Sequence, residues 1–163
     1  MEIRTTRYDH PDAVKLDDLV QQEYIQRYND GGDSTPMHPA HFDPPNGLYL
    51  LAYDESGQAV ASGGWRAQEA SSEGHEDGDA EIKRMFVVPE ARGRGLARAI
   101  LAELEASAAA AGRTRMVLET GLKQPEAIAL YSSCGYLPVT KFGYYRHEPL
   151  SRCMGKPLVA PAN

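Results

Sequence analysis

A short segment rich in arginine and glycine, Arg92-Gly93-Arg94-Gly95-Leu96-Ala97, has the residue types that bind phosphate. Glycines let backbone N–H groups approach an anion closely and adopt the dihedral angles that this needs. The segment leads into a stretch with helical periodicity, and the first N–H groups of a helix attract anions. Arginines add charged donors. These features predict a phosphate site, although a plain strand-to-helix turn with solvated arginines fits them equally well.

The segments on either side of this loop have patterns typical of strands and helices. Apolar or alternating runs predict strands at 2–8, 48–54, 59–65, 80–88 and 115–120, with two more in the tail after 136. Apolar side chains that recur every three or four residues predict helices at 10–28, from 96 onwards and at 124–135. A loop rich in Gly, Pro and Asp is expected at 29–47 and an acidic one at 69–79. The order predicts a single α/β domain over residues 1–163.

Composition excludes several classes of function. The formal net charge of −6 argues against nucleic-acid binding, which depends on neutralising phosphates. No apolar run approaches the roughly 20 residues of a membrane span, and the first residues lack a signal-peptide core, so a cytoplasmic protein is expected. Cys134 and Cys153 are expected to be free thiols without a nucleophilic role, and the scattered histidines predict no metal site.

Two motifs occur in a fixed order around the glycine loop. The loop matches [Q/R]-x-x-G-x-[G/A]. The segment Val87-Val88-Pro89 lies just before it, with two residues in between. Residues 126–136, "EAIALYSSCGY", match A-x-x-L-Y-x-x-x-G-[FY]. Together they resemble the GNAT N-acetyltransferase superfamily, and the chain looks like a small bacterial-type member. The resemblance is strong over 80–137 and compatible over 1–66. Gln124 departs from the asparagine often found there, which leaves a cofactor contact at that position less certain.

The resemblance implies a fold and a cofactor. The expected fold is a mixed, mostly antiparallel sheet of about six or seven strands, splayed between the fourth and fifth strands and flanked by about four helices. The expected cofactor is acetyl-CoA, with CoA as the product. Backbone groups of the loop would hold its pyrophosphate, and the N–H of Val87 would face the thioester carbonyl. The cofactor-binding residues implied are Phe86, Val87, Val88, Arg92, Gly93, Arg94, Gly95, Leu96, Ala97, Gln124, Ala127 and Tyr131.

Acetyl transfer by direct attack on the thioester needs a base and benefits from an acid. The amine must lose its proton before or during attack, through a tetrahedral intermediate. Glu81 lies eleven residues before Arg92, the spacing seen in GNAT enzymes with a glutamate base on this strand, so the resemblance makes it the candidate. Glu119 is a rival, and an ion-paired strand-end carboxylate is the structural alternative for Glu81. Tyr131 matches the family's general-acid tyrosine, although its position also suits core packing.

The acceptor is open at this stage. Trp65, Arg84, Glu119 and Tyr145 are candidate substrate-binding residues, with Arg66, Arg146 and Tyr144 as further possibilities. An arginine facing the cleft would favour an amino-acid-like acceptor, whereas acidic residues would favour a polyamine, an aminoglycoside or a protein lysine. A small-molecule primary amine is preferred. The alternatives are a catalytically idle acyl-CoA sensor and a protein-lysine acetyltransferase; a homodimer is possible in each case.

Overall fold

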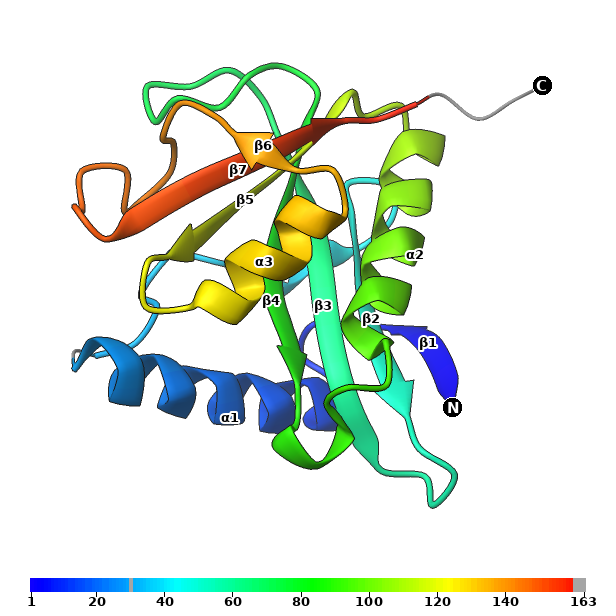
Figure 1. Ribbon diagram of the computed structural model, residues 1–163. Coiled ribbons are helices and arrows are strands. Elements are labelled where there is room, and N and C mark those ends of the chain that lie inside the picture. The colour runs from blue at the N-terminus through cyan, green and yellow to red at the C-terminus, as the bar shows by residue number, and fades with distance from the viewer. Residues whose placement is uncertain (30, 160–163) are drawn as a thin grey trace.

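The computed structural model describes residues 1–29 and 31–159. Its strands are β1 (Glu2–Thr6), β2 (Gly47–Tyr53), β3 (Ala59–Gln68), β4 (Asp79–Val87), β5 (Arg115–Gly121), β6 (Leu137–Pro138) and β7 (Ser151–Pro157), and its α-helices are α1 (Pro11–Tyr28), α2 (Leu96–Ala110) and α3 (Pro125–Ser133). The strands form one seven-stranded sheet in the order β1-β2-β3-β4-β5-β7-β6 (Figure 1). All neighbouring pairs are antiparallel except β4 and β5, which are parallel. The expected mixed sheet is confirmed.

The helix count differs from expectation. The described residues contain three α-helices rather than about four. The long segment between α1 and β2 forms only a short 3-10 helix, η1 (Pro39–Phe42). Its sequence contains Pro36, Pro39, Pro44 and Pro45, and proline lacks the N–H that an α-helix interior needs. This composition agrees with the loop expected at 29–47, and the three α-helices are the three that apolar periodicity predicts.

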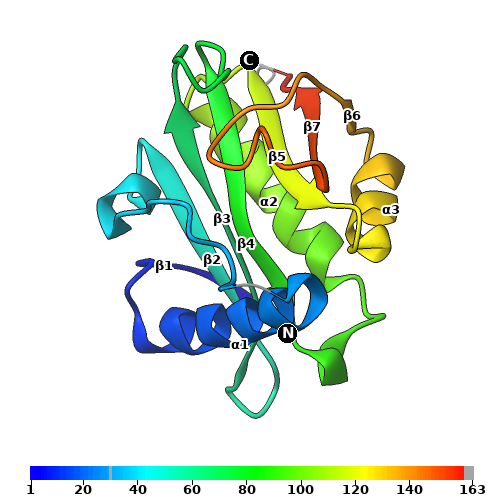
Figure 2. The same ribbon diagram turned by 90° about the vertical axis from the view of Figure 1, so that its left-hand side faces the viewer.

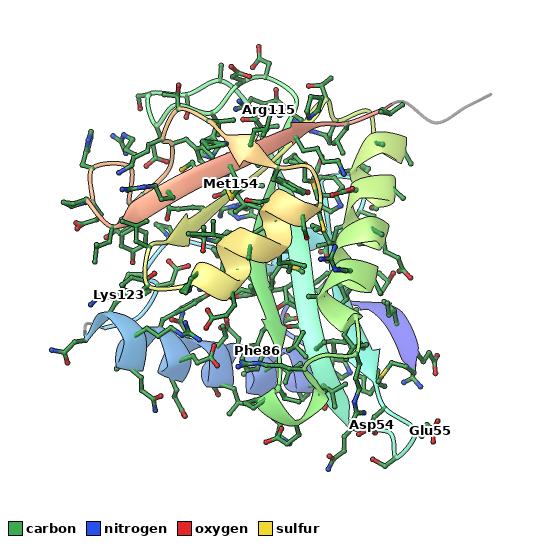
Figure 3. All side chains as sticks on the ribbon, in the orientation of Figure 1. Asp54, Glu55, Phe86, Arg115, Lys123 and Met154 are labelled. Atoms are coloured by element: carbon green, nitrogen blue, oxygen red, sulfur yellow. The ribbon has the colours of Figure 1, made fainter. Side chains whose placement is uncertain are left out.

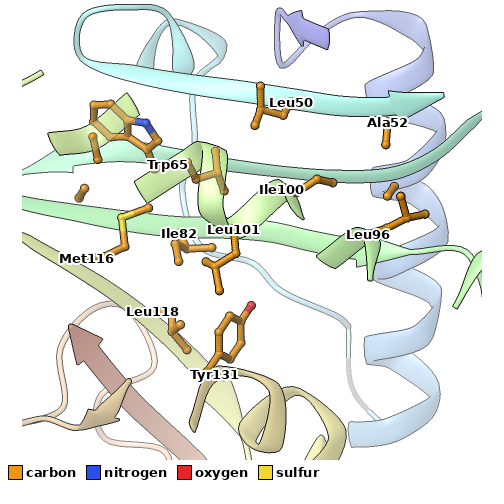
Figure 4. Close-up of a cluster of buried hydrophobic side chains, with 14 of the residues drawn as sticks. Leu50, Ala52, Trp65, Ile82, Leu96, Ile100, Leu101, Met116, Leu118 and Tyr131 are labelled. Carbon is orange, nitrogen blue, oxygen red and sulfur yellow. The ribbon is translucent and has the colours of Figure 1, made fainter. Parts of the chain in front are cut away.

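The helices cover the two faces of the sheet (Figures 1 and 2). On one face, Leu16 and Val20 of α1 pack with Phe42, Tyr49 and Phe86, and Figure 3 shows Phe86 on the α1 side of β4. On the other face, α2 and α3 cover the larger cluster of buried side chains that Figure 4 shows in close-up. Each face therefore has its own apolar core, and the site lies where the sheet between them opens.

The opening lies between β4 and β5. These strands pair only through Asp79, Ala80 and Glu81, which lie opposite Arg115, Met116 and Val117. Beyond Glu81 the two strands diverge (Figure 1). The backbone groups on this side of 82–87 are therefore not used in a β4–β5 ladder. The expected splay between the fourth and fifth strands is present.

A bulge in β4 coincides with the start of this divergence. Two β4 residues, Arg84 and Met85, lie opposite the single residue Gly63 of β3. Arg84 has a left-handed backbone with φ 59°, an uncommon conformation for a residue with a side chain. Because the bulge interrupts the alternation of a strand, the neighbours Lys83 and Arg84 both bond to Asp33. It thus turns two consecutive cations toward the α1 face.

Candidate active site

A cleft of about 800 Å³ occupies the divergence between β4 and β5. Its walls come from α1, from β4 and β5, from the N-terminal end of α2 and from α3. Ten of the twelve expected cofactor residues line it: Phe86, Val87, Arg92, Gly93, Gly95, Leu96, Ala97, Gln124, Ala127 and Tyr131. Val88 and Arg94 do not line it. Backbone and side chains from distant parts of the sequence thus meet around one elongated space.

The glycine loop has the geometry of an anion cradle. Gly93 and Gly95 have φ values of 80° and 77°, which favour glycine. Gly95 is the N-cap of α2 and provides no side chain to bond the first N–H groups of that helix. A Cβ on either glycine would meet no atom within 4 Å, because this side of the loop is open. The loop therefore presents unpaired helix N–H groups to the cleft.

The arginines of the loop do not all face this cradle. Arg92 turns back, donating to the Val87 carbonyl at 2.9 Å and to Glu23 of α1 at 2.6 Å. Arg94 is exposed and lies outside the cleft lining. Arg98, one turn into α2, lines the cleft and donates to Ser133 of α3 at 2.6 Å. Arg92 therefore joins the loop to α1. The sequence predicts that Arg94 brings a positive charge to the cleft, but Arg98 is the arginine that lines it.

The N–H of Val87 points into the divergence. The next residue, Val88, donates its N–H to Val60 of β3 at 2.9 Å. Successive backbone groups of a strand point to opposite sides, so the groups of Val87 face away from β3. The bond from Arg92 to the Val87 carbonyl supports the same orientation. Val87 also lines the cleft, so its N–H is directed toward that space.

Tyr131 lies on the cleft wall formed by α3. Its side chain is buried, and Figure 4 shows the hydroxyl pointing away from α3. The ring packs edge-on against Tyr136, with ring centroids 5.6 Å apart. Burial, with smaller effects from Tyr24 and Cys134, raises the pKa of the Tyr131 hydroxyl above its ordinary value. The group therefore keeps its proton at neutral pH, as a proton donor must.

Glu81 is buried, and one of its carboxylate oxygens accepts two hydrogen bonds. Its Oε1 accepts from Arg66 Nε at 3.1 Å and from Gln68 Nε2 at 3.0 Å, and His75 Nε2 lies 3.6 Å away. Burial alone would raise the pKa of this carboxyl, but His75 and the charges of Lys83 and Arg66 outweigh it and lower the pKa to about 2. Glu81 does not line the 800 Å³ cleft. Its surroundings make it a structural anion and a weak base.

Glu119 has the opposite surroundings. It lines the cleft, and its buried Oε2 has no hydrogen-bond partner of normal geometry among the described residues. Burial raises the pKa of this carboxyl to about 7, with help from the negative charges of Glu81 and Asp33 and against the positive charge of Lys83. A carboxylate poised near neutral pH is suited to take a proton from an amine.

The other candidates for acceptor binding differ in position. Arg84 and Tyr145 line the cleft, but the buried Arg84 guanidinium is held by Asp17 and Asp33. The Tyr145 hydroxyl accepts from the N–H of Ser34 at 2.6 Å and so fixes the loop after α1.

Trp65 lies outside the cleft. It is 1% exposed, packs in the core beneath α2 and donates its indole N–H to Ser107 at 3.2 Å. The expectation that Trp65 contacts substrate is therefore corrected. Its position on β3 directs it to the α2 face, whereas the neighbouring Arg66 faces α1.

Sequence reasoning missed the charged cluster around Glu81. His75, Asp33 and Lys83 all belong to it, and His75 and Asp33 come from segments expected to be loops. A signal was available on the strands. Polar residues alternate with apolar ones at Arg66 and Gln68 of β3 and at Glu81 and Lys83 of β4, so one face of an otherwise apolar sheet was marked as polar.

The splayed sheet, the glycine loop at a helix N-terminus and the buried tyrosine that lines the same cleft are the features that the resemblance to the GNAT superfamily leads us to expect. The family model for the acetyltransferase (GNAT) family matches residues 13–136. The chain belongs to this family. The family uses acetyl-CoA, so the anion cradle described above fits the cofactor's pyrophosphate.

Several relatives agree with this placement. The chain is 38% identical over 151 residues to an IAA acetyltransferase from Azospirillum brasilense, covering 88% of this chain and 93% of that protein. It is 32% identical over 158 residues to an uncharacterised N-acetyltransferase from Schizosaccharomyces pombe, covering 85% and 86%. A solved structure from Klebsiella pneumoniae, described as an acyl-CoA N-acyltransferase, superposes with a TM-score of 0.76 at 29% identity, covering 97% of both chains. A phosphinothricin acetyltransferase from Sinorhizobium meliloti, solved in complex with AcCoA, shares the fold with a TM-score of 0.64 at 23% identity, covering 96% and 88%.

The described residues contain no helix that is long and apolar enough to span a membrane. Both cysteines are free, as expected. Cys153 is buried, and burial raises the pKa of its thiol to about 11, which makes it a poor nucleophile.

Proposed function

We propose that this protein is an acetyl-CoA-dependent N-acetyltransferase that acetylates the primary amine of a small molecule. The observation that carries the proposal is the single cleft that joins the cradle at Gly95 to the poised carboxylate of Glu119. The first position suits the pyrophosphate of the cofactor and the second suits the removal of a proton. The arm of the cofactor would lie between them, along the edge of β4 that is not paired with β5.

The chain's own residues can perform each proton transfer. The amine nitrogen attacks the thioester carbonyl carbon, so that a C–N bond forms and the C–S bond breaks. Glu119 takes a proton from the amine, and Tyr131 gives one to the departing thiolate. The Val87 N–H faces the position where negative charge develops on the carbonyl oxygen, and such a donor stabilises that charge.

Glu119 replaces Glu81 as the preferred base. A base with a pKa near 2 holds its charge too strongly to accept a proton at neutral pH, and Glu81 already accepts bonds from Arg66 and Gln68. Glu119 has both a free oxygen and a pKa of about 7. Glu81 instead fixes Arg66 in the wall behind Glu119.

The test is the release of free thiol from acetyl-CoA in the presence of amines. The panel contains amino acids, simple alkylamines, polyamines, aminoglycosides, arylamines and a lysine peptide, and it includes IAA because a relative carries that name. Release that requires both the protein and one class of amine, with the acetylated amine found by mass spectrometry, supports the proposal.

Two results would contradict it. Thermal stabilisation by acetyl-CoA without thiol release from any amine would favour the idle acyl-CoA sensor. Release only with the lysine peptide would favour a protein-lysine acetyltransferase.

A further inference from the structure

A second, smaller pocket of about 180 Å³ adjoins the cleft. Lys83 and Glu119 line both cavities, so they form the wall between them. Since a water molecule occupies roughly 30 Å³ in the liquid, the small pocket has room for about six waters. It lies beyond Glu119 as seen from the cofactor cradle, where the body of an acceptor would extend.

Five charged side chains are among those that line the small pocket: Arg66, Lys83, Glu73, Glu81 and Glu119. Arg66, Glu81 and Lys83 are 7%, 3% and 8% exposed. Burying charges is costly unless they are paired, and these are paired: Arg66 with Glu81 at 3.1 Å and Lys83 with Asp33 at 3.2 Å. The fold therefore maintains a set of charges around a space too small for the cofactor.

Two buried polar atoms that face this space are poorly satisfied. The side chain of His75 is 3% exposed and its Nε2 lies 3.6 Å from Glu81 Oε1, beyond hydrogen-bond distance, and Glu119 Oε2 makes no hydrogen bond of normal geometry among the described residues, although Ser151 lies close to that carboxyl. Both residues line the small pocket. Because buried polar atoms are nearly always bonded, two such atoms in one pocket indicate a polar ligand.

The remaining hydrogen-bond capacity of the pocket is mostly that of donors. Arg66 has five N–H donors, of which Nε serves Glu81 and NH1 serves the Pro36 carbonyl. Lys83 has three, one of them directed at Asp33. Glu81 and Asp33, by contrast, already accept bonds from these cations. Of the three carboxylates that line the pocket, Glu81 accepts from Arg66, Glu73 pairs with Arg146 at 3.5 Å, and Glu119 is left for the amine. The remaining donors of Arg66 and Lys83 are available to a carboxylate.

We propose, resting on the acetyl transfer proposed above, that the acceptor is a compact amino acid whose amine meets Glu119 and whose carboxylate enters the small pocket toward Arg66 and Lys83. The product is then the N-acetylamino acid. Glu119 at the wall between the cavities holds the amine beside the thioester, and the arginine fork suits a carboxylate. Contacts at both the amine and the carboxylate would fix the orientation of a small molecule that has few other groups to bind.

The first experiment compares three amines of similar size: alanine, alaninamide and ethylamine. Thiol release from acetyl-CoA is measured at equal concentrations of the unprotonated amine, with spermidine and a lysine peptide alongside. A pocket whose buried donors are left unpaired discriminates strongly, so kcat/KM for alanine should exceed that for ethylamine by about 100-fold or more. Alaninamide should also fall well below alanine.

The second experiment asks whether Arg66 binds the acceptor or only neutralises Glu81. In Arg66→Gln/Glu81→Gln both charges of the pair are removed, so no buried charge is left alone. We expect the KM for alanine to rise at least about tenfold, with the KM for acetyl-CoA unchanged, and the preference for alanine over ethylamine in kcat/KM to shrink by a similar factor. Arg7→Gln, which removes an exposed arginine paired with Asp9, is the control and should match the parent protein.

The outcomes separate the two proposals. Thiol release with ethylamine or spermidine that equals or exceeds release with alanine would overturn the amino-acid acceptor and leave the acetyltransferase standing. An unchanged KM for alanine in the double variant would overturn the role of Arg66. Absence of release with every amine would contradict the acetyltransferase itself.

Discussion

Two glutamates, Glu81 and Glu119, line the same small pocket and have different surroundings. Glu81 accepts hydrogen bonds from Arg66 and Gln68, whereas the buried oxygen of Glu119 has no such bond. Their pKa values separate accordingly, to about 2 and about 7. Pairs of carboxyl groups with divided pKa values commonly divide the work of a site, with one held ionised and the other exchanging protons.

Replacing each glutamate by glutamine should therefore have unequal effects. Glu119→Gln should lower kcat/KM by roughly 10²–10⁴-fold, because a general base is lost. Glu81→Gln should retain most of kcat. The measurement is steady-state thiol release with the best acceptor; a larger loss in Glu81→Gln than in Glu119→Gln would restore Glu81 as the base.

Tyr131→Phe tests the acid. The change removes only the hydroxyl and keeps the ring that packs against Tyr136. We expect turnover to fall by about 10²-fold, near the low end of general acid catalysis, because a thiolate is already a good leaving group. Affinity for acetyl-CoA, measured by calorimetry, should change little. Full turnover in this variant would show that Tyr131 serves packing alone.

At the scale of elements, the site is assembled by the ends of helices and the edge of a strand. Gly95 begins α2 without a side-chain cap, and β4 leaves β5 after Glu81. Much of this was predictable, since glycines before a helical pattern indicate an open helix N-terminus. The elements and their order also followed from apolar periodicity.

The remaining features depend on contacts that local patterns do not encode. The face of the sheet to which Trp65 points depends on strand register. The low pKa of Glu81 depends on Arg66 of the neighbouring strand and on His75 of the preceding loop, and only the tertiary fold brings these side chains to the carboxyl. Sequence spacing placed a glutamate near the reacting atoms. Only the fold shows which of the two glutamates is free.

Gly95→Glu tests the cradle at α2. The new carboxylate would project into open space next to the helix N–H groups and would compete with a phosphate there. We expect loss of acetyl-CoA binding by at least about 100-fold, measured by calorimetry. Gly112→Glu is the matched control: Gly112 has φ 83° and equally open space, at the opposite end of α2. Equal loss of affinity in both variants would assign the effect to backbone strain instead of the cradle.

At the scale of the whole molecule, the free carboxyl of Glu119 costs stability. Its pKa is about 7 in the folded protein and near the ordinary 4.5 when unfolded. Between these pH values the folded state binds more protons than the unfolded state, so stability falls as pH rises from 4.5 to 7. Burial is the main cause of the raised pKa, and the charges of Glu81 and Asp33 add to it while that of Lys83 opposes it.

Glu119→Gln should accordingly gain stability relative to the parent as pH rises. After allowance for partial exposure, the gain at pH 8 over that at pH 4.5 is roughly 1–2 kcal/mol, or about 3–6 °C in Tm. Differential scanning fluorimetry at the two pH values measures it. A Tm difference between variant and parent that is the same at both pH values would contradict a raised pKa at Glu119. If the expected result is found, replacing Glu119 raises the stability of the fold and lowers the activity of the protein.

The bulge at Arg84 predicts how the site responds to the deletion of one residue. One residue in excess in β4 changes which side chains face α1 and coincides with the divergence from β5. Deletion of Arg84 would leave Lys83 and Met85 in regular alternation and would shift every later residue of β4 by one position. The backbone groups of Val87 would then exchange the side that faces the cleft for the side that faces β3. Short deletions here should therefore abolish acetyl-CoA binding while most of the secondary structure persists.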